Sequence, residues 1–260
     1  MRNVRWYAVP LVVAGTSLSL SSPVLAQSES KPRRACETQA APGFTQLFTG
    51  TLKDFKGLPT ATNMQLLSLG TVAAAGAFPA DAKISNTFSK TRLTETFEAG
   101  RTIGATPIHL AASFTAYGLG RSFKNPCLAS LGADLVQAQL MAEMLSQGVK
   151  FTVQRTRPDG TARSFPSGHT TMSFATATVL QNHFGWKVGL PAYAVASYVA
   201  ASRVQAQRHY LSDVLFGAAL GTVAGRTVTF GTKQRFAISP VAPMDGGPGG
   251  GVELTWVGKK

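Results

Sequence analysis

The stretch PSGHTTMSFATATVL, residues 166–180, has the pattern of a helix start followed by a buried helix. Ser167 is a favourable N-cap, because its hydroxyl can accept a hydrogen bond from an amide of the first turn. The residues from Met172 to Leu180 are mostly apolar or small, as expected for a helix that is covered on most sides. We therefore predict a helix that runs from Ser167 to His183.

The first turn of this helix is also a candidate anion site. Gly168 would let the backbone approach a ligand closely, and the exposed amides at the start of a helix attract anions. His169 lies at the mouth of this turn, where it could donate a proton to a leaving oxygen. A plain capping motif with an incidental histidine would have the same sequence.

Two cations precede this stretch. Lys150 and Arg157 are seven residues apart, close to two helical turns. If a helix that starts near Ala133 continued to Arg157, both side chains would point to one side, and Pro158 would end the helix. Cations are also favoured at helix C-termini for purely structural reasons, so this spacing alone does not identify a site.

A histidine and an aspartate follow the stretch 166–180. His209 and Asp213 are four residues apart and would share one face of a helix. The carboxylate could then accept a hydrogen bond from Nδ1 and leave Nε2 free as a nucleophile. Such a pair is also common as a structural hydrogen bond. Arg203 would lie about 240° from His209 on a continuous helix, so the chain must break near residues 205–208 for both to reach one pocket.

The remaining pattern predicts an all-α fold, a bundle of about six helices, followed by a small C-terminal β-hairpin. The predicted helices are Met64 to Pro79, Thr102 to Gly118, Ala133 to Val149, Ser167 to His183, Leu190 to Ala201 and His209 to Val228. The strands of the hairpin would be Phe236 to Val241 and Val252 to Trp256, on either side of a glycine-rich run; a strand-like disordered tail is the alternative.

The N-terminus has the form of a secretory signal peptide, with a basic start, a short apolar region and a small-residue exit at residues 24–26. We therefore expect four segments: residues 1–26 as signal peptide, 27–60 as a tethering arm, 61–232 as the helical domain and 233–260 as hairpin or tail. An uncleaved membrane anchor is the alternative for the first segment. The mature protein is expected to be exported to the periplasm.

The formal net charge is +13, and it is +11 without the signal peptide, which holds two arginines and no acidic residue. This surplus favours anionic partners. No run of Lys and Arg with interleaved aromatic residues suggests a nucleic-acid partner. No predicted helix supplies about 20 clearly apolar residues, so a soluble or membrane-surface bundle is favoured over an embedded one. Cys36 and Cys127 either form one disulfide or stay as two thiols, and no histidine lies at metal-ligand spacing from either.

Taken together, three blocks resemble the signature of the type 2 phosphatidic acid phosphatase (PAP2) superfamily, which includes class A acid phosphatases and vanadium haloperoxidases. The blocks are K-x6-R-P from Lys150, P-S-G-H from Pro166 and S-R-x5-H-x3-D from Ser202, and every defining position is present. The match spans residues 150–213. Only seven residues, 159–165, separate the first block from the second, fewer than is usual in the family, which leaves the substrate less certain.

The resemblance implies a phosphatase that uses no metal or other cofactor. His209 would be the nucleophile, Asp213 would stabilise its imidazolium, and His169 would act as acid and then as base. The phosphate would be bound by Lys150, Arg157, Ser167, Gly168 and Arg203. Vanadate is expected to bind as a phosphate mimic.

The expected substrate is a phosphorylated lipid or a small phosphoester or pyrophosphate. One alternative is a vanadium-dependent haloperoxidase, for which a mature chain of about 234 residues leaves little room. Another is a non-catalytic, basic envelope-binding protein, which does not account for both histidines and the aspartate. His109 and His183 are expected to be structural, the latter at a helix end.

Overall fold

The structure, a computed structural model, describes residues 42–90, 94–230, 234–241 and 251–258. The predicted signal peptide lies outside these ranges, as do residues 27–41 of the predicted arm. The proposed Cys36–Cys127 disulfide includes Cys36, which also lies outside them.

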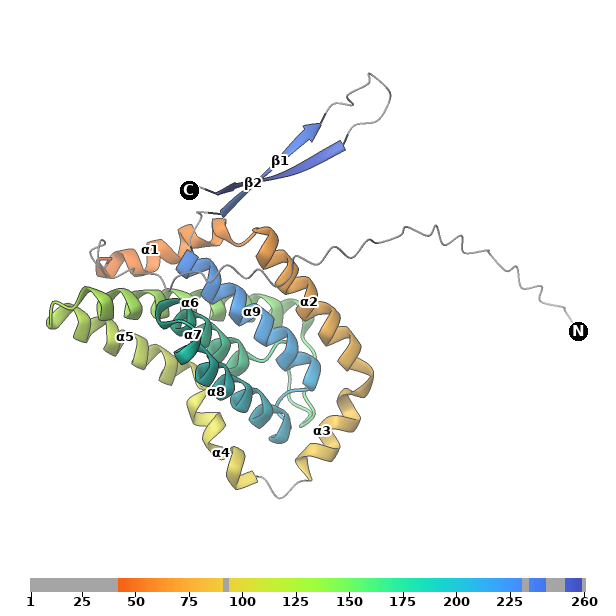
Figure 1. Cartoon of the computed structure of the whole chain (residues 1–260). Coiled ribbons are helices and arrows are strands. Elements are labelled where there is room, and N and C mark those ends of the chain that lie inside the picture. Colours follow the sequence, from red (N-terminus) through yellow and green to blue (C-terminus); the bar gives the residue numbers. More distant parts are fainter. Residues whose placement is uncertain (1–41, 91–93, 231–233, 242–250, 259–260) are drawn as a thin grey trace, which may run out of the picture. The chain divides into compact units, whose positions relative to one another are not determined.

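The described part of the chain is helical up to Phe230, which confirms the all-α prediction. Its helices are α1 Phe44–Asp54, α2 Ala61–Ala77, α3 Asp81–Ser89, α4 Thr94–Ile103, α5 Thr106–Ser122, α6 Pro126–Val153, α7 Gly168–Phe184, α8 Trp186–Gln205 and α9 Leu211–Phe230 (Figure 1). Two 3-10 turns, Phe55–Gly57 and Phe78–Ala80, follow α1 and α2. The prediction of about six helices was too low, because the short helices α1, α3 and α4 were taken for arm and connections.

Two strands follow the helices, β1 Gln234–Val241 and β2 Gly251–Gly258. They pair antiparallel, with Phe236 opposite Trp256 and Ile238 opposite Leu254. These strands include the two stretches of alternating apolar and polar residues from which the sequence predicts a hairpin, 236–241 and 252–256.

The described part of the predicted arm is a packed helix, which corrects the expectation of a tether. Leu47 of α1 is fully buried and packs with Tyr117 of α5 and Val136 of α6. Tyr117 also donates its hydroxyl hydrogen to the carbonyl of Pro42 at 2.7 Å, and Gln137 donates to the carbonyl of Gln46 at 3.2 Å. Because Leu47 lies among mostly polar neighbours in the sequence, its burial depends on partners far along the chain.

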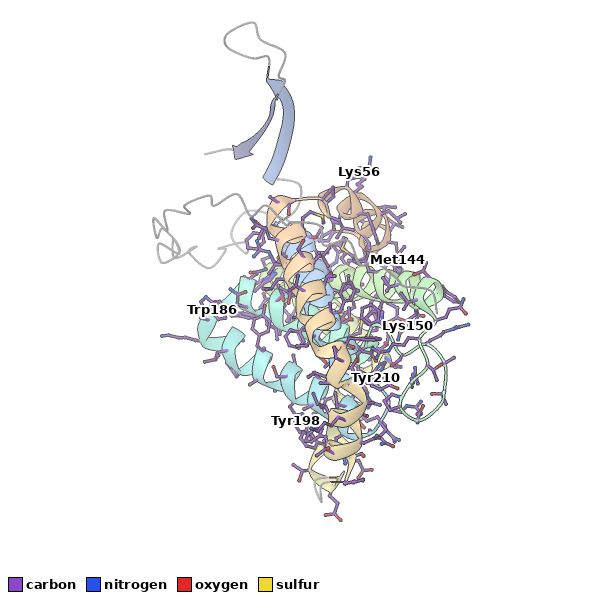
Figure 2. The ribbon with its side chains drawn as sticks, turned by 90° about the vertical axis from the view of Figure 1, so that its right-hand side faces the viewer. Lys56, Met144, Lys150, Trp186, Tyr198 and Tyr210 are labelled. Carbon is purple, nitrogen blue, oxygen red and sulfur yellow. The ribbon has the colours of Figure 1, made fainter. Side chains whose placement is uncertain are left out.

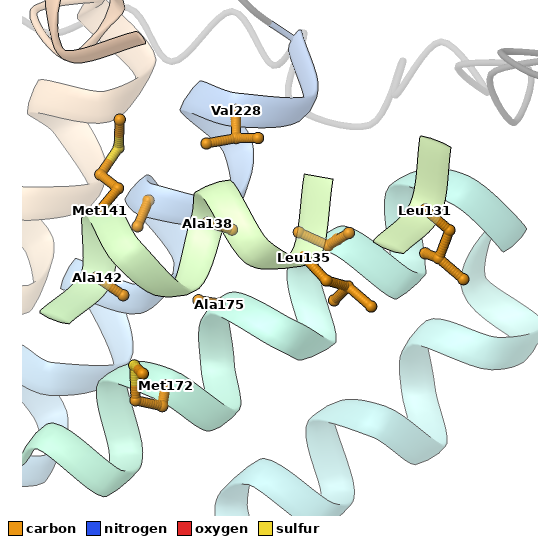
Figure 3. Close-up of a cluster of buried hydrophobic side chains, with 10 residues drawn as sticks. Leu131, Leu135, Ala138, Met141, Ala142, Met172, Ala175 and Val228 are labelled. Atoms are coloured by element: carbon orange, nitrogen blue, oxygen red, sulfur yellow. The ribbon is translucent and has the colours of Figure 1, made fainter. Parts of the chain in front are cut away.

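The main core lies between α6, α7 and α9. The cluster contains Leu131, Leu135, Ala138, Met141, Ala142, Met172, Ala175, Val179, Ala224 and Val228 (Figure 3). Helix α6 begins at Pro126 because Asn125 caps its first turn, accepting from the Leu128 amide at 3.1 Å, and because proline is favoured at the first helical position. This core fixes the end of α6 beside the start of α7.

Glycines on α9 allow the backbone of α7 to come unusually close. A Cβ atom on Gly217 would lie 2.9 Å from the carbonyl oxygen of Ser167, and one on Gly221 would lie 2.1 Å from that of Thr171. On Gly225 it would lie 2.8 Å from the carbonyl oxygen of Ala175. The spacing of four keeps these glycines on one face of α9, so the two helices meet backbone to backbone.

Helix α2 covers another face of α9 (Figure 1). Asn63 donates to the hydroxyl of Thr227 at 3.0 Å, and Gly70 faces Ala219. Within the described ranges, no helix combines the length and apolar character that a membrane span requires.

Candidate active site

Backbone contacts join the three sequence blocks around the start of α7. Lys150 donates to the carbonyl of Pro166 at 2.5 Å, which links the first block to the second. The amide of Ser167 donates to the carbonyl of Asp213 at 3.1 Å, which links the second to the third. The fold therefore brings together residues that are up to 63 positions apart in the sequence. Figure 2 labels Lys150, from the first block, and Tyr210, which follows His209 in the third.

Helix α6 ends at Val153, so the condition under which Arg157 would share a helical face with Lys150 is not met. Gln154 adopts the left-handed conformation, with φ 48°, and closes the helix. The chain then forms a tight loop, in which the Arg157 amide donates to the carbonyl of Thr161 at 2.7 Å and Gly160 has φ 84°. The short spacer before Pro166 thus forms this turn, and the Asp159 amide joins it to the segment before His209 by donating to the carbonyl of Gln207 at 3.2 Å.

Lys150 holds this loop in place. Its ammonium group donates to the carbonyls of Arg163 at 3.0 Å and Pro166 at 2.5 Å. Burial lowers the pKa of Lys150 to about 8, and the neighbouring Arg157 adds to this effect. Two of its three ammonium hydrogens are therefore engaged by the protein, and one is left for a ligand.

The start of α7 has the cap that the sequence predicts. The Ser167 hydroxyl accepts from the Thr170 amide at 3.5 Å and from the Thr170 hydroxyl at 2.9 Å. The amides of Gly168 and His169 belong to the first turn, which has no helical acceptors of its own. The side chains of Ser146 and Lys150 lie beside Gly168, so the turn faces α6.

Arg203, which is buried, and Arg157, which is half-buried, both have unsatisfied hydrogen-bond donors. Nε of Arg157, and both Nε and Nη1 of Arg203, find no partner among the described residues. Burial, followed by repulsion from Arg208, lowers the pKa of both guanidinium groups, that of Arg203 to about 10. An unsatisfied buried donor is costly, but Nε of Arg226 is orphaned in the same way. Only Arg157 and Arg203 also lower the pKa of His209 or His169, so these two groups indicate a place for an anion.

His209 differs from the prediction, because it precedes α9 rather than lying on it. Its Nδ1 is 2.6 Å from the carbonyl oxygen of Ser164, whereas the nearest carboxylate oxygen of Asp213 is 3.5 Å away. A carbonyl can only accept, so Nδ1 carries the hydrogen and Nε2 has the free lone pair. The break before His209 occurs where the sequence predicts it, since α8 ends at Gln205 and Gln207 has φ 55°.

Asp213 is fully buried and accepts from several donors. Its Oδ2 accepts from the Ser164 hydroxyl, and also from the Tyr210 amide at 2.9 Å. Burial alone would raise the pKa of Asp213, but contacts with His209, Ser164 and Tyr210 outweigh burial and lower it. Asp213 is therefore a carboxylate that organises the turn around His209.

Both histidines of the site are electrically neutral at pH 7. Burial lowers the pKa of His209 to about 4; Lys150 and Arg157 act in the same direction, and Asp213 opposes them. Burial, with repulsion from Arg203 and His209, lowers the pKa of His169 to about 3. A hydrogen bond with the backbone of Arg101, on α4, opposes this shift for His169.

Sequence analysis missed Arg155 and Asp81. Arg155 donates to Asp213 at 2.7 Å and to Asp81 at 2.8 Å, so it joins α3 to α9. Only the position of Arg155, two residues before Arg157, could have drawn attention to it. Asp81 lies far from every block in the sequence and carries no local signal.

The other histidines lie outside the site. His109 contacts the hydroxyls of Ser173 at 3.3 Å and Thr176 at 2.9 Å, and His183 is 2.8 Å from Asp134. In the described part of the chain, no group of three or more His, Cys, Asp or Glu residues is arranged to hold a metal ion.

Comparisons with known proteins agree with the resemblance seen in the sequence. The chain is 42% identical over 99 residues to a lipid A 1-phosphatase of Porphyromonas gingivalis, an alignment that covers 36% of this chain and only 22% of that protein. A transmembrane PAP2-type phosphatidylglycerolphosphate phosphatase from Bacillus subtilis has a similar fold, with a TM-score of 0.50 and 22% identity over 72% of this chain and 94% of that one. LpxE from Aquifex aeolicus has a TM-score of 0.49 and 22% identity over 57% and 93% of the two chains.

The family model described as PAP2 superfamily matches residues 131–236, a range that contains all three blocks. Over this segment, the chain is similar to the PAP2 superfamily.

Proposed function

We propose that this protein is a metal-independent phosphatase that cleaves phosphate monoesters or pyrophosphates through a phosphohistidine on His209. The observation that carries the proposal is that Arg157 and Arg203 have unsatisfied guanidinium donors and lie close enough to the two histidines to lower their pKa, Arg157 that of His209 and Arg203 that of His169. Fixed donors of this kind suit the equatorial oxygens of a transferring phosphoryl group, and they need no metal to balance its charge.

The first step uses His209 as nucleophile. Its Nδ1 is hydrogen-bonded to the Ser164 carbonyl, so Nε2 presents its lone pair to phosphorus. The N–P bond forms while the bond from phosphorus to the leaving oxygen breaks. His169 gives its proton to that oxygen, and the alcohol or phosphate product departs.

His169 needs to gain a proton before this step. Repulsion from Arg203 contributes to its low pKa in the free protein. A bound phosphate offsets the positive charge of Arg203, so substrate binding favours protonation of His169.

The second step reverses the role of His169. The neutral imidazole takes a proton from water, the water oxygen attacks phosphorus, and the N–P bond breaks to release inorganic phosphate. His209 returns to its starting form.

A lipid phosphate is the favoured substrate. The relatives named above are described as phosphatases of lipid A and of phosphatidylglycerolphosphate. Large apolar side chains are exposed on α2, α5 and α8, among them Val72, Ile108 and Leu190. Together with the positive net charge, they would suit the surface of an anionic membrane. We further propose that the protein is exported and acts in the periplasm.

The mechanism is tested with His209→Ala. We expect this variant to lose phosphate release, and only the wild-type protein to carry acid-labile label after rapid quenching with a labelled substrate. His183→Ala is the matched control, because His183 is also buried but is paired with Asp134, away from the site. Full turnover by His209→Ala would exclude His209 as the nucleophile.

The substrate class is tested with a phosphate-release panel, with and without detergent. The panel contains lipid A, phosphatidate, phosphatidylglycerophosphate, undecaprenyl pyrophosphate and a soluble aryl phosphate. Higher kcat/KM for one lipid in mixed micelles supports the lipid proposal. Highest activity on the aryl phosphate, unaffected by detergent, contradicts it.

A further inference from the structure

We propose that Arg155, together with Asp81, is a positioning residue for the nucleophile: it holds the Asp213 carboxylate and neutralises part of its charge, so that His209 stays an unprotonated imidazole. This role presupposes that His209 is the nucleophile, as in the proposed function. Arg155 itself contacts no reacting group.

Arg155 connects three segments through short, charged hydrogen bonds. Its Nη1 donates to Oδ1 of Asp213 and to the hydroxyl of Ser212, both at 2.7 Å. Its Nη2 donates to Oδ2 of Asp81 at 2.8 Å. Because both ends of the guanidinium group are used, rotation of the side chain would break at least one charged bond.

Asp81 fixes the same turn through Ser212. Its Oδ1 accepts from the Ser212 amide at 3.0 Å, and its Oδ2 accepts from the Ser212 hydroxyl. The side chain of Asp81 is 3% exposed and that of Asp213 is fully buried. The first turn of α9 is therefore held by α3 through Asp81 and by the loop after α6 through Arg155.

Two aromatic rings restrict the guanidinium further. The Arg155 guanidinium carbon lies 4.7 Å from the centre of the Phe78 ring and 4.1 Å from that of Tyr210. Both distances are within the range of cation–π contact. Since Tyr210 directly follows His209, the packing of Arg155 also limits movement of the nucleophile's backbone.

Arg155 and His209 meet different oxygens of Asp213, since Arg155 binds Oδ1 and His209 lies nearest Oδ2. Charged or titratable groups near His209 are Lys150 from α6, Arg157 from the loop, His169 from α7 and Asp213 from α9. Without Arg155, Asp213 and Asp81 would be two buried carboxylates that share no counter-ion. The more negative surroundings would favour the protonated form of His209, which cannot attack phosphorus.

Loss of the positive charge of Arg155 should therefore change the pH dependence of kcat/KM. In Arg155→Gln, the acid limb of the kcat/KM profile should shift to higher pH by about one unit, because His209 stays protonated up to a higher pH. kcat should fall by up to about 100-fold, because a misplacement of the nucleophile by about 1 Å can cost that much in rate. Arg155→Lys should restore part of kcat and return the limb towards its original pH. Asp81→Asn should lower kcat without an upward shift of the limb, because it removes a negative charge.

Arg226→Gln is the matched control. Arg226 is also a partly buried arginine that packs on an aromatic ring, that of Phe230, at 5.1 Å. It lies 13 residues along α9 from Asp213, about 20 Å away. Its loss should leave the pH profile unchanged.

A cavity beside Arg155 permits chemical rescue. Arg155, Phe78, Val153 and Phe216 are among the residues that line a cavity of about 480 Å³. We expect millimolar ethylguanidinium to restore part of the activity of Arg155→Ala, whereas urea, which has a similar shape but no charge, should not.

Titration of the His209 ring by NMR, in the full-length protein, separates this inference from the proposed function. A raised pKa of His209 in Arg155→Gln supports the positioning role even if the wild-type protein proves inactive. An unshifted titration in a folded Arg155→Gln protein overturns it, whatever the activity. If Arg155→Gln does not fold, Asp81→Asn is titrated instead. A lowered pKa of His209 then supports the role, because a negative charge has been removed, and an unchanged or raised pKa overturns it.

Discussion

Replacement of Gly221 by alanine tests whether close contact between α7 and α9 builds the site. The added Cβ atom would lie 2.1 Å from the carbonyl oxygen of Thr171, about 0.9 Å short of the 3.0 Å below which real Cβ contacts are essentially never found. The obstacle is backbone within α7, so it cannot rotate away. The helices must separate by nearly 1 Å, and overpacking of this kind costs about 1–3 kcal/mol.

The same displacement should affect catalysis. Ser167 and His169 belong to the start of α7, whereas Asp213 belongs to α9, so a shift of one helix misaligns the amides and the nucleophile. A misplacement of about 1 Å can cost about 100-fold in rate. We expect Gly221→Ala to lose both stability and kcat/KM, measured by denaturant unfolding and by phosphate release.

Gly118→Ala is the control for Gly221→Ala. Gly118 lies within α5, and a Cβ atom there would meet nothing within 4 Å. Alanine should therefore stabilise this helix, by up to about 1 kcal/mol, and leave activity unchanged. If Gly221→Ala were as stable and as active as the wild-type protein, the close helix contact would not be what positions the site.

Three further predictions concern charge. Burial lowers the pKa of His109 and His209 to about 4 and that of His169 to about 3, below the ordinary 6.5. Between pH 6.5 and 4, the unfolded chain therefore binds more protons than the folded protein, so the melting temperature should fall as the pH falls through this range. A melting temperature that stays constant over this range would contradict the prediction that these histidines are neutral in the folded protein. Vanadate should inhibit the phosphatase activity competitively, and EDTA should not inhibit it. If EDTA abolished the activity and a divalent ion restored it, the proposed mechanism would be contradicted. Arg203→Met should lower kcat/KM by about 100-fold or more, since a donor to the transition state is lost, and an unchanged value would remove Arg203 from the phosphate site.

The residues of the candidate site could be predicted because each block carries a local signal. Ser167 has the chemistry of an N-cap and is one in the structure, and the break between Arg203 and His209 follows from helical geometry. These signals depend on neighbours within a few residues. They identify which side chains meet but not their exact partners.

The parts that could not be predicted depend on contacts between distant segments. Arg155 and Asp81 are 74 residues apart, and neither belongs to a periodic pattern. The Ser164 carbonyl is a backbone group, which no sequence pattern can mark as the partner of His209. Helix α1 was missed because Leu47, its fully buried residue, has its partners on α5 and α6.

The hydrogen bond from His209 to the Ser164 carbonyl has a consequence for acid tolerance. A carboxylate partner would accept a proton in acid and could no longer choose the imidazole tautomer. A peptide carbonyl does not titrate in any range in which a protein stays folded. Because the main chain orients this imidazole, the reactive nitrogen stays the same from neutral conditions down to the acidity at which the ring itself takes up a proton.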